Sequence, residues 1–474
     1  MPRAKSVYVC DSCGNESPKW EGRCPSCGQW NTLGEVRVDA APARRMLRAE
    51  PPTAPAMELS KVSAERLPRL ELSSGEVNRV LGGGVVPGSI ALIAGAPGIG
   101  KSTLVLRILS DVADSVGPAL YVTGEESMAQ VKMRADRLGV SGKGIHLLQA
   151  TALSQVLAQL AEARPAIAVV DSIQTLYDDS LESTAGTVAQ IRECTRALMG
   201  WAKANDVPLV LTGHVTKGGD IAGPRVLEHM VDVVLYLEGD PVSSWRLLRS
   251  IKNRFGSTNE VGVFEMMAHG LVDVQDPSRA FLSERREGAV GSVVVSTMEG
   301  SRPLLVEVQA LTNPSLLPAP RRVATGVDFN RLLMVCAVLS RRAGVSLAGQ
   351  DVVVNVTGGL RIGEPAVDLG MALAIVSCLR NAPVRPGLAA TGEIGLTGEV
   401  RGVPQLSRRI AEAARLGLRE CLVPAARGEK LEGVEGLETV PVSTLAQAIA
   451  AALPRRGRRE SEATEAVATA ADGA

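Results

Sequence analysis

The sequence predicts an α/β protein with a small cysteine-rich module, a core built on a parallel sheet, and a further α/β domain. Three observations support this. Four of the eight cysteines lie within the first 27 residues. Between about residues 60 and 274, short β-rich apolar runs alternate with amphipathic stretches, which is typical of a parallel sheet covered by helices on both faces. A glycine-rich turn directly follows the first of these runs.

Length and charge limit the classes of protein that the chain can belong to. Its 474 residues allow two to four domains at roughly 100–200 residues each. Lys plus Arg and Asp plus Glu both number 51, so binding to a polyanion must use local patches of charge. No apolar run approaches the ~18 residues that cross a bilayer, and the N-terminus lacks the apolar core of a secretion signal. We therefore expect a cytoplasmic protein without a membrane contact.

The first four cysteines form two CxxC knuckles, each with a glycine directly after its second cysteine. Four thiolates at this spacing predict one closed, structural Zn²⁺ site. A module of about 30 residues needs such a metal to fold. Disulfides or a redox pair are the weaker alternatives. The expected ligands are Cys10, Cys13, Cys24 and Cys27, while Lys19, Trp20, Arg23 and Trp30 either contact a partner or, for the two tryptophans, pack over the metal.

The other four cysteines stand singly in apolar segments, as small core residues of a reducing compartment do. They are Cys194, Cys336, Cys378 and Cys421. In the core, apolar runs predict buried strands at residues 90–95, 119–124, 166–171 and 207–213. Helical spacing of apolar residues predicts helices at 102–113, 151–163 and 188–204.

The turn at residues 95–103 follows the first strand and opens a helix with the pattern GxxxxGK[ST]. Glycines let backbone N–H groups surround a phosphate, and the helix amino terminus adds partial positive charge. Lys101 would reach the β- and γ-phosphates, and Ser102 would offer its hydroxyl to Mg²⁺. The pattern predicts an ATP site formed by Gly95, Ala96, Pro97, Gly98, Ile99, Gly100, Lys101, Ser102 and Thr103.

Carboxylates at the ends of two other strands complete this predicted site. Asp171 ends the run AIAVVD, where it would hold Mg²⁺ from the carboxyl edge of the sheet; a turn or cap is the alternative. Glu125 or Glu126 would activate the attacking water, with a weak preference for Glu125. Ser127 and Gln130 also have the spacing of a capping box.

Two polar segments follow later strands. His214 begins the segment HVTK at the end of the fourth strand, where it would sense the γ-phosphate or serve only as a structural residue. Lys217 begins a glycine-rich stretch behind it. The segment KNRFG follows the run WRLLRSI and would complete a neighbouring subunit's nucleotide site or bind DNA phosphates, unless it is a solvated basic turn. Its residues are Lys252, Asn253, Arg254, Phe255 and Gly256.

These motifs resemble the bacterial RadA (Sms) family of DNA-repair proteins. The shared segments are CxxC-x10-CxxC, GAPGIGKST, GEES, HVTK, LEHMVD and KNRFG, in the same order across essentially the whole chain. The resemblance implies a RecA-like ATPase between an N-terminal zinc finger and a C-terminal domain related to the Lon protease domain. It further implies a DNA-dependent ATPase and hexameric helicase of homologous recombination, which drives branch migration on single-stranded and branched DNA together with RecA.

Residue roles follow from the resemblance one by one. Lys101 and Ser102 would contact nucleotide and Mg²⁺, and Asp171 would supply the carboxylate on the Mg²⁺ side. Lys252 and Arg254 would couple ATP to DNA. Lys217 would occupy the place of a RecA-type DNA-binding loop.

The C-terminal domain matches the Lon segments but lacks their chemistry. Ala366 stands where the nucleophilic serine should be, and Ser407 falls at or next to the lysine position, beside Arg408. A Ser–Lys dyad needs a hydroxyl and an amine that can lose its proton, whereas a guanidinium stays protonated. We expect a proteolytically inactive scaffold. A second expectation is that arginines of this domain line a DNA channel; the alternative is that they are simply solvated. These residues are Arg321, Arg322, Arg341, Arg342, Arg408 and Arg409.

The expected order is a zinc finger at 1–34, a linker at 35–60, the ATPase domain at 61–275, the Lon-like domain at 285–453 and a disordered tail at 454–474. The leading hypothesis is a ring motor on DNA. An ATP-gated DNA-binding adaptor without unwinding is the alternative, and an ATP-dependent protease is disfavoured by Ala366.

Overall fold

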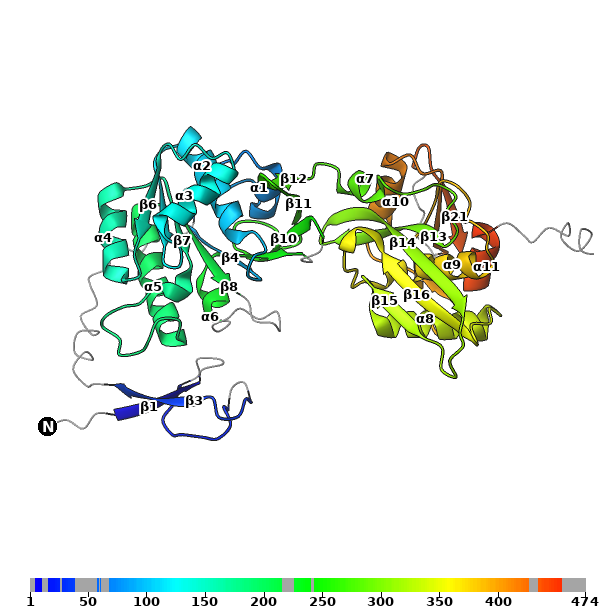
Figure 1. Cartoon of the computed structure of the whole chain (residues 1–474), viewed down its shortest axis with the longest axis horizontal. Coiled ribbons are helices and arrows are strands. Elements are labelled where there is room, and N and C mark those ends of the chain that lie inside the picture. The colour runs from blue at the N-terminus through cyan, green and yellow to red at the C-terminus, as the bar shows by residue number, and fades with distance from the viewer. Residues whose placement is uncertain are drawn as a thin grey trace, which may run out of the picture. The chain divides into compact units, whose positions relative to one another are not determined.

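A computed structural model describes residues 5–10, 16–25, 28–38, 58, 60, 68–214, 226–239, 243–425 and 434–453. Cys13, Cys27 and Lys217 lie outside the described residues, as do most of the expected linker and the tail at 454–474. The chain divides into two compact units (Figure 1). One comprises Met1–Gly239 and Arg246–Asp273, and the other comprises Asp240–Trp245 and Val274–Ala474. The domain boundaries expected from the sequence stay predictions.

The N-terminal module is a three-stranded antiparallel sheet with the order β2-β1-β3. Its strands are β1 (Lys5–Cys10), β2 (Glu16–Ser17) and β3 (Leu33–Val38). Its small core joins Cys10, Cys24 and Leu33, with Tyr8 packed against them. So few apolar side chains give the module little hydrophobic stabilisation, as expected for a fold held by a metal.

The first unit also contains a nine-stranded sheet of order β12-β11-β10-β9-β4-β8-β7-β5-β6. The six strands β9, β4, β8, β7, β5 and β6 pair in parallel, and β10 pairs antiparallel with β9. The strands are β4 (Ile90–Gly95), β5 (Ala119–Thr123), β6 (Ile145–Gln149), β7 (Ile167–Asp171), β8 (Leu209–His214), β9 (Val233–Glu238), β10 (Trp245–Asn253), β11 (Val261–Met267) and β12 (Gly270–Asp273).

Helices cover both faces of this sheet because the central strands bury side chains on both sides. In β4, Ala91 and Ile93 join a core with α1 and α2, whereas Ile90, Leu92 and Ala94 join a second core with α4 and α5. The helices are α1 (Gly75–Leu81), α2 (Lys101–Ser115), α3 (Met128–Arg137), α4 (Leu153–Ala163), α5 (Val188–Asn205) and α6 (Val226–Met230), with a 3₁₀ turn η2 (Ile173–Thr175).

The four strands and three helices predicted from the sequence are confirmed, with bounds shifted by at most two residues. The capping box at Ser127 and Gln130 is also present and begins α3. The strands β6, β9, β11 and β12 and the helices α1 and α6 were not predicted. β6 lies at the sheet edge, where its side chains are only partly buried, so its apolar signal is weak.

The second unit contains a seven-stranded mixed sheet of order β15-β16-β14-β13-β17-β20-β21. α9 packs on one face of this sheet and contacts α8 and α11, and α10 covers the opposite face at Val294 and Leu305. Its elements are α7 (Pro277–Leu282), β13 (Ser292–Glu299), β14 (Arg302–Pro314), β15 (Arg322–Thr325), α8 (Phe329–Arg342), β16 (Gln350–Val356), η3 (Thr357–Gly359), η4 (Pro365–Val367), α9 (Asp368–Leu379), β17 (Leu388–Ala390), β18 (Glu393–Ile394), β19 (Val400–Arg401), α10 (Leu406–Arg415), β20 (Glu420–Pro424), β21 (Glu438–Val442) and α11 (Leu445–Ala452).

Three of the single cysteines, Cys194, Cys336 and Cys421, are buried, and Cys378 is half-buried, as expected for core thiols. Among the described residues, no helix combines the length and the apolar character needed to cross a bilayer.

Candidate nucleotide-binding site

The phosphate loop connects the carboxyl end of β4 to the first turn of α2. Gly100 has φ 119°, a backbone conformation that favours glycine. A Cβ at this position would lie 2.7 Å from the Met266 side chain, and one at Gly95 would lie 2.6 Å from the Leu237 carbonyl oxygen. α2 begins without a side-chain cap, so its first N–H groups are available to an anion.

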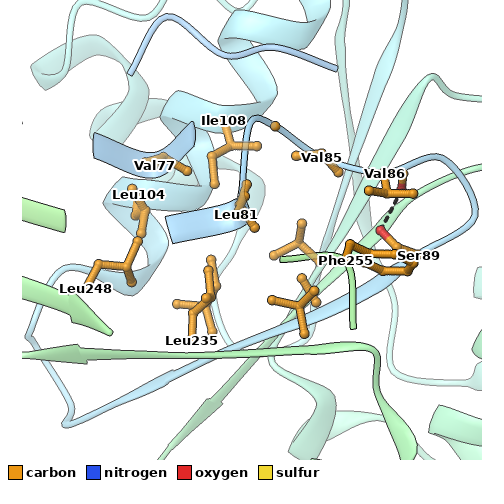
Figure 2. Close-up of a pocket in the computed structure, with 15 residues that line it drawn as sticks. Val77, Leu81, Val85, Val86, Ser89, Leu104, Ile108, Leu235, Leu248 and Phe255 are labelled. Carbon is orange, nitrogen blue, oxygen red and sulfur yellow. Dashed lines mark hydrogen bonds between the residues drawn. The ribbon is translucent and has the colours of Figure 1, made fainter. Parts of the chain in front are cut away.

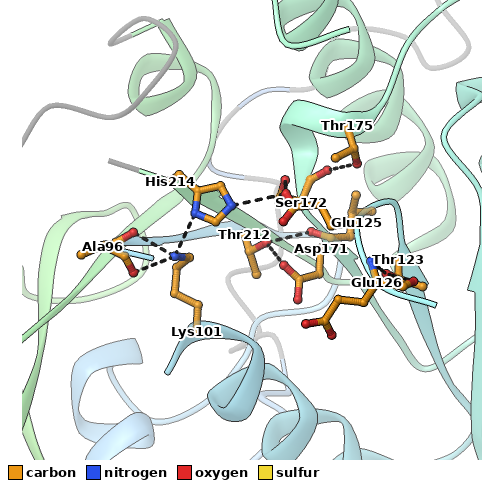
Figure 3. Close-up of polar contacts among 12 residues, drawn as sticks. Ala96, Lys101, Thr123, Glu125, Glu126, Asp171, Ser172, Thr175, Thr212 and His214 are labelled. Carbon is orange, nitrogen blue, oxygen red and sulfur yellow. Dashed lines mark hydrogen bonds and ion pairs between the residues drawn. The ribbon is translucent and has the colours of Figure 1, made fainter. Parts of the chain in front are cut away.

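Lys101 lies over this loop with its ammonium group held by neighbours (Figure 3). Its Nζ donates to the carbonyl oxygens of Gly95 at 2.9 Å and Ala96 at 3.0 Å. It also lies 3.2 Å from His214 Nδ1. Burial lowers the pKa of Lys101, and the carboxylates of Asp171 and Glu125 oppose that shift. These contacts hold the cation at the phosphate loop.

Asp171 ends β7 and is oriented by two hydroxyl groups. Tyr121 OH donates to its Oδ2 and Thr212 Oγ1 donates to its Oδ1, both at 2.5 Å. Tyr121 and Thr212 are themselves fully buried. Burial and the adjacent carboxylate raise the pKa of Tyr121, so its phenol stays protonated and continues to donate. Sequence motifs do not reveal Tyr121, because it looks like an ordinary apolar residue within a strand.

The two adjacent glutamates face different surroundings, which the sequence left open. Glu125 Oε1 accepts from Ser172 Oγ at 2.5 Å and lies 3.3 Å from His214 Nε2 (Figure 3). Glu126 instead forms an ion pair with Arg134 of α3, and its backbone is bonded to the Thr123 hydroxyl. Glu125 thus belongs to the cluster around Lys101, and the Glu126 carboxylate is taken by Arg134.

His214 connects Lys101 to Glu125. Its Nδ1 faces the Lys101 ammonium group, which can only donate, so Nδ1 accepts and Nε2 carries the proton toward Glu125. His214 is the last residue of β8. Lys217 follows it by three positions in the sequence and lies outside the described residues.

Arg246 is a further residue that sequence reasoning missed. This buried side chain of β10 donates from Nε to the Ile99 carbonyl oxygen in the phosphate loop at 3.2 Å. A polar residue inside the strand-like run WRLLRSI gives no sign of that distant contact. The hydrogen bond from Arg246 supports the phosphate loop from the side of the sheet that carries the antiparallel strands.

An apolar pocket lies between α1, α2 and the sheet (Figure 2). Leu104 and Ile108 of α2, Leu235 of β9 and Leu248 of β10 are among its lining residues. Ser89 is the polar side chain in the lining, and its hydroxyl donates to the Val86 carbonyl oxygen. The pocket offers no group for phosphate chemistry. It is part of the hydrophobic core, into which the ring of Phe255 packs.

The KNRFG segment is bound into the fold by specific contacts. Lys252 Nζ donates to the carbonyl oxygens of Glu228 at 2.7 Å, His229 at 3.0 Å and Val231 at 2.7 Å. It thereby satisfies carbonyl groups at the end of α6. Arg254 pairs with the buried carboxylate of Asp232.

The rest of the segment holds α1. Asn253 Nδ2 lies 3.3 Å from the Val80 carbonyl oxygen and 3.2 Å from that of Leu81. The Phe255 carbonyl oxygen accepts from Arg69 at 2.6 Å. A Cβ on Gly256 would lie 3.2 Å from the Gly82 backbone. The interpretation as a merely solvated basic turn is therefore wrong.

The KNRFG segment lies at the edge of the sheet opposite the phosphate loop of the same chain. Asn253 pairs with Val233, which pairs with Ala91 near the start of β4. The phosphate loop begins after Gly95, at the other end of β4, about 13–16 Å away at ~3.3 Å per residue. Within one chain, the structure therefore does not bring Lys252 or Arg254 to the nucleotide.

In the N-terminal module, Cys10 and Cys24 share the small buried core, and Cys13 and Cys27 lie outside the described residues. Cys24 belongs to a tight turn in which Gly28 N donates to its carbonyl oxygen. Two thiols in one core, from two separate knuckles, fit a tetrathiolate Zn²⁺ site. Trp20 and Trp30 are exposed by 57% and 69%, which favours the alternative in which they contact a partner.

Replacing Cys24 with serine is expected to abolish stoichiometric zinc binding and to unfold the N-terminal module, because the metal supplies its folding free energy. Metal analysis of the purified variant measures the first effect. Cys194→Ser in α5 is the matched control, since that cysteine lies in the ATPase core. A full zinc complement in Cys24→Ser would refute the four-thiolate assignment.

In the second unit, the positions of the Lon dyad carry no catalytic pair. Ala366 is buried and its carbonyl oxygen accepts from Gly392 N at 2.8 Å. Ser407 is exposed on the first turn of α10. An alanine methyl group offers no nucleophile.

A buried ion pair lies beside these positions. Arg409 is fully buried, and its guanidinium donates to both carboxylate oxygens of Glu364, at 2.8 and 2.6 Å. It also donates to the carbonyl oxygens of Ser296 at 2.8 Å and Pro404 at 3.0 Å. The expectation that Arg409 lines a DNA channel is therefore wrong. Arg409 is buried because it lies on the inward face of the amphipathic helix α10.

Arg322 is also held within its own domain, because it donates to the carbonyl oxygens of Arg321, Leu347 and Gln350. The remaining arginines proposed for a channel are exposed. They are Arg321, Arg341, Arg342 and Arg408.

The parallel sheet, the phosphate loop at its carboxyl edge and the carboxylates beside it define a P-loop ATPase of the AAA/RecA-like class. Family models match this architecture in three places: a rubredoxin metal binding domain at residues 8–35, an AAA domain at 53–220, and a Lon protease (S16) C-terminal proteolytic domain at 347–455. The predicted fold class is confirmed.

Similarity to curated proteins extends over nearly the whole chain. The DNA repair protein RadA of Bacillus subtilis is 46% identical over 456 residues, which is 96% of this chain and all of that protein. RadA of Pseudomonas aeruginosa is 48% identical over 452 residues, 95% of this chain and 99% of that protein. The chain belongs to the RadA family of DNA repair proteins, and the resemblance seen in its motifs is confirmed.

Proposed function

We propose that this protein is a DNA-dependent ATPase that acts as a helicase or translocase in homologous recombination. It promotes branch migration on single-stranded and branched DNA together with a RecA recombinase, in the cytoplasm. The observation that carries this proposal is the chain of contacts Lys101–His214–Glu125. It links the phosphate loop to the end of β8, from which the chain continues to Lys217.

The residues around the phosphate loop have separate roles in hydrolysis. Lys101 leaves the Gly95 and Ala96 carbonyl oxygens and follows the β- and γ-phosphates. Ser102 and Asp171 offer the hydroxyl and carboxylate oxygens that Mg²⁺ prefers, and a bound Mg²⁺ would neutralise phosphate charge. His214 loses its partner when Lys101 turns to the nucleotide. Its reorientation then moves the segment that bears Lys217.

Glu125 is the residue that we expect to take a proton from the attacking water. Glu125→Gln should lower kcat for ATP by about 10²–10⁴-fold, since an amide cannot accept that proton, while ATP binding persists. Glu126→Gln is the matched control and should keep turnover within a few fold, because its carboxylate already faces Arg134. Steady-state hydrolysis and equilibrium nucleotide binding separate the two effects. Loss of turnover only in Glu126→Gln would reverse the assignment.

The KNRFG segment serves a neighbouring subunit, because it lies at the edge of the sheet away from its own phosphate loop. A hexameric ring of identical subunits would place Lys252 and Arg254 beside the next subunit's nucleotide. Their contacts with α6 and Asp232 then connect that nucleotide to the segment at residues 215–225, which precedes α6 in the sequence. We also propose that each subunit has the domain boundaries expected from the sequence.

Replacing Lys252 with alanine is expected to keep DNA binding and basal hydrolysis but to lose stimulation of hydrolysis by DNA. The reason is that three carbonyl oxygens at the end of α6 lose their donor, which disconnects α6 from β10. Hydrolysis with and without single-stranded DNA measures this coupling. Lys203→Ala on α5, an exposed lysine, is the control. Stimulation equal to wild type in Lys252→Ala would make the contact purely structural.

A forked-DNA strand-displacement assay tests the proposed function directly. We expect the labelled strand to be displaced with ATP. We expect no displacement with a non-hydrolysable analogue or without nucleotide. Nucleotide-dependent DNA binding without displacement would identify an ATP-gated adaptor instead. Salt dependence of binding should be steep, since phosphate contacts release counterions.

A further inference from the structure

Two tryptophans of the N-terminal module stand in solvent close to each other. Trp20 and Trp30 are exposed by 57% and 69%, although the chain has only four tryptophans. The strand-like pairing of Arg23 with Trp30 and the bond from Asn31 N to the Gly22 carbonyl oxygen at 2.8 Å hold the backbone at Trp30 against residues 22 and 23, which follow Trp20 closely in the sequence. Adjacent exposed apolar groups mark binding sites more often than scattered ones do, and tryptophan is enriched at interfaces.

The two indoles lie on either side of Gly22, close to the position of its missing side chain. A methyl group built on Gly22 would lie 3.8 Å from Cη2 of Trp20 and 3.8 Å from Cζ3 of Trp30. The three atoms nearest to that position all belong to these two rings. The two rings therefore flank the position that a side chain at residue 22 would occupy, at van der Waals distance from it.

Cations accompany this pair of rings. The Arg23 guanidinium carbon lies 5.9 Å from the centre of the Trp30 ring, and its Nε is held by the Gly28 carbonyl oxygen at 2.8 Å. Lys19, directly before Trp20, is exposed. With Glu21 as the carboxylate between them, residues 19–23 carry a net positive charge. Exposed aromatic rings beside cations are the arrangement that binds unpaired bases and their phosphates.

We propose that Trp20 and Trp30 form a stacking site for an unpaired base of single-stranded DNA, with Lys19 and Arg23 beside the flanking phosphates. A nucleotide combines a flat aromatic base with an anionic phosphate, which matches two exposed neighbouring indoles and the cations beside them. This inference rests on the proposed function, in which single-stranded DNA is a substrate. It adds a DNA contact outside the ATPase unit.

Base stacking can be separated from phosphate binding with two probes. The full-length protein is titrated with a labelled deoxythymidine oligomer and with an abasic oligomer of equal length, at one fixed salt concentration. Trp30→Ala and Trp20→Ala should each weaken binding of the thymidine oligomer about fivefold or more. Binding of the abasic oligomer should stay unchanged, because its phosphates still meet Lys19 and Arg23.

Gly22→Ala is the sharpest variant, since it keeps both indoles and only adds a methyl group in van der Waals contact with each of them. The Gly22 backbone has no left-handed conformation that would exclude alanine, so the module should fold and bind zinc as before. We expect the same selective loss for the thymidine oligomer. Trp201→Phe is the control, because Trp201 packs against the ATPase core. Zinc content and DNA-free ATP hydrolysis verify that each variant is folded.

The outcomes distinguish this inference from the function on which it rests. If all three variants bind the thymidine oligomer as wild type does, the stacking site is refuted and the exposed pair serves a protein partner. Equal losses for both oligomers would also refute stacking. A wild-type protein that binds neither oligomer would overturn the proposed function, and this inference with it.

Discussion

Lys101→Ala is expected to reduce ATP hydrolysis by at least about a hundredfold, in the range found when one preorganised donor to a developing charge is removed. The Lys101 ammonium group lies at the phosphate loop, where the Gly95 and Ala96 carbonyl oxygens hold it in position. Alanine leaves the backbone N–H groups of the loop in place but removes the charge that follows the γ-phosphate.

The measurement is steady-state phosphate release with and without single-stranded DNA, together with equilibrium binding of a nucleotide analogue. Lys132→Ala is the matched control, because Lys132 is exposed on α3 and pairs with Asp136. Its turnover should equal that of wild type. Hydrolysis by Lys101→Ala at the wild-type rate would remove the phosphate loop from the mechanism.

Arg409→Ala is expected to lower the free energy of unfolding of the second unit by about 3–5 kcal/mol, the usual effect of removing one partner of a buried pair. Arg409 is fully buried, whereas the Glu364 side chain is 22% exposed. The variant leaves the Glu364 carboxylate and the Ser296 and Pro404 carbonyl oxygens without their donor. Denaturant unfolding of the variant measures this loss.

Two controls make this prediction specific. Arg408→Ala changes the neighbouring exposed arginine and should shift stability by no more than about 0.5 kcal/mol. Arg409→Met combined with Glu364→Gln should be more stable than Arg409→Ala, because no unpaired charge remains. The amide oxygen introduced by Glu364→Gln can still accept from Met298 N, which donates to the Glu364 carboxylate at 2.6 Å in the wild-type chain. An Arg409→Ala protein as stable as wild type would show that the pair contributes nothing.

Much of the candidate ATP site could be located from the sequence because phosphate binding needs a local pattern of residues. The pattern from Gly95 to Thr103 combines glycines, a lysine and a hydroxyl within one turn, so no long-range contact is needed to recognise it. Asp171 could be found for a related reason, since the carboxyl ends of parallel strands meet at one edge.

The residues that orient these groups could not be predicted in the same way. Tyr121 and Arg246 look like strand residues, and only strand order brings Tyr121 to Asp171 and Arg246 to the phosphate loop. Glu125 and Glu126 are neighbours of the same chemical type. Their different partners, His214 and Arg134, come from β8 and α3.

The sequence by itself determined that this is an α/β ATPase with a cysteine knuckle, and that its Lon-like domain has alanine at the nucleophile position, because each of these features depends on residue types at fixed spacing. Tertiary structure alone decided that KNRFG lies away from its own phosphate loop, that Arg409 is buried, and that Trp20 and Trp30 are exposed. The physical reason is that strand register and burial arise from contacts between residues far apart in the chain, which no local pattern encodes.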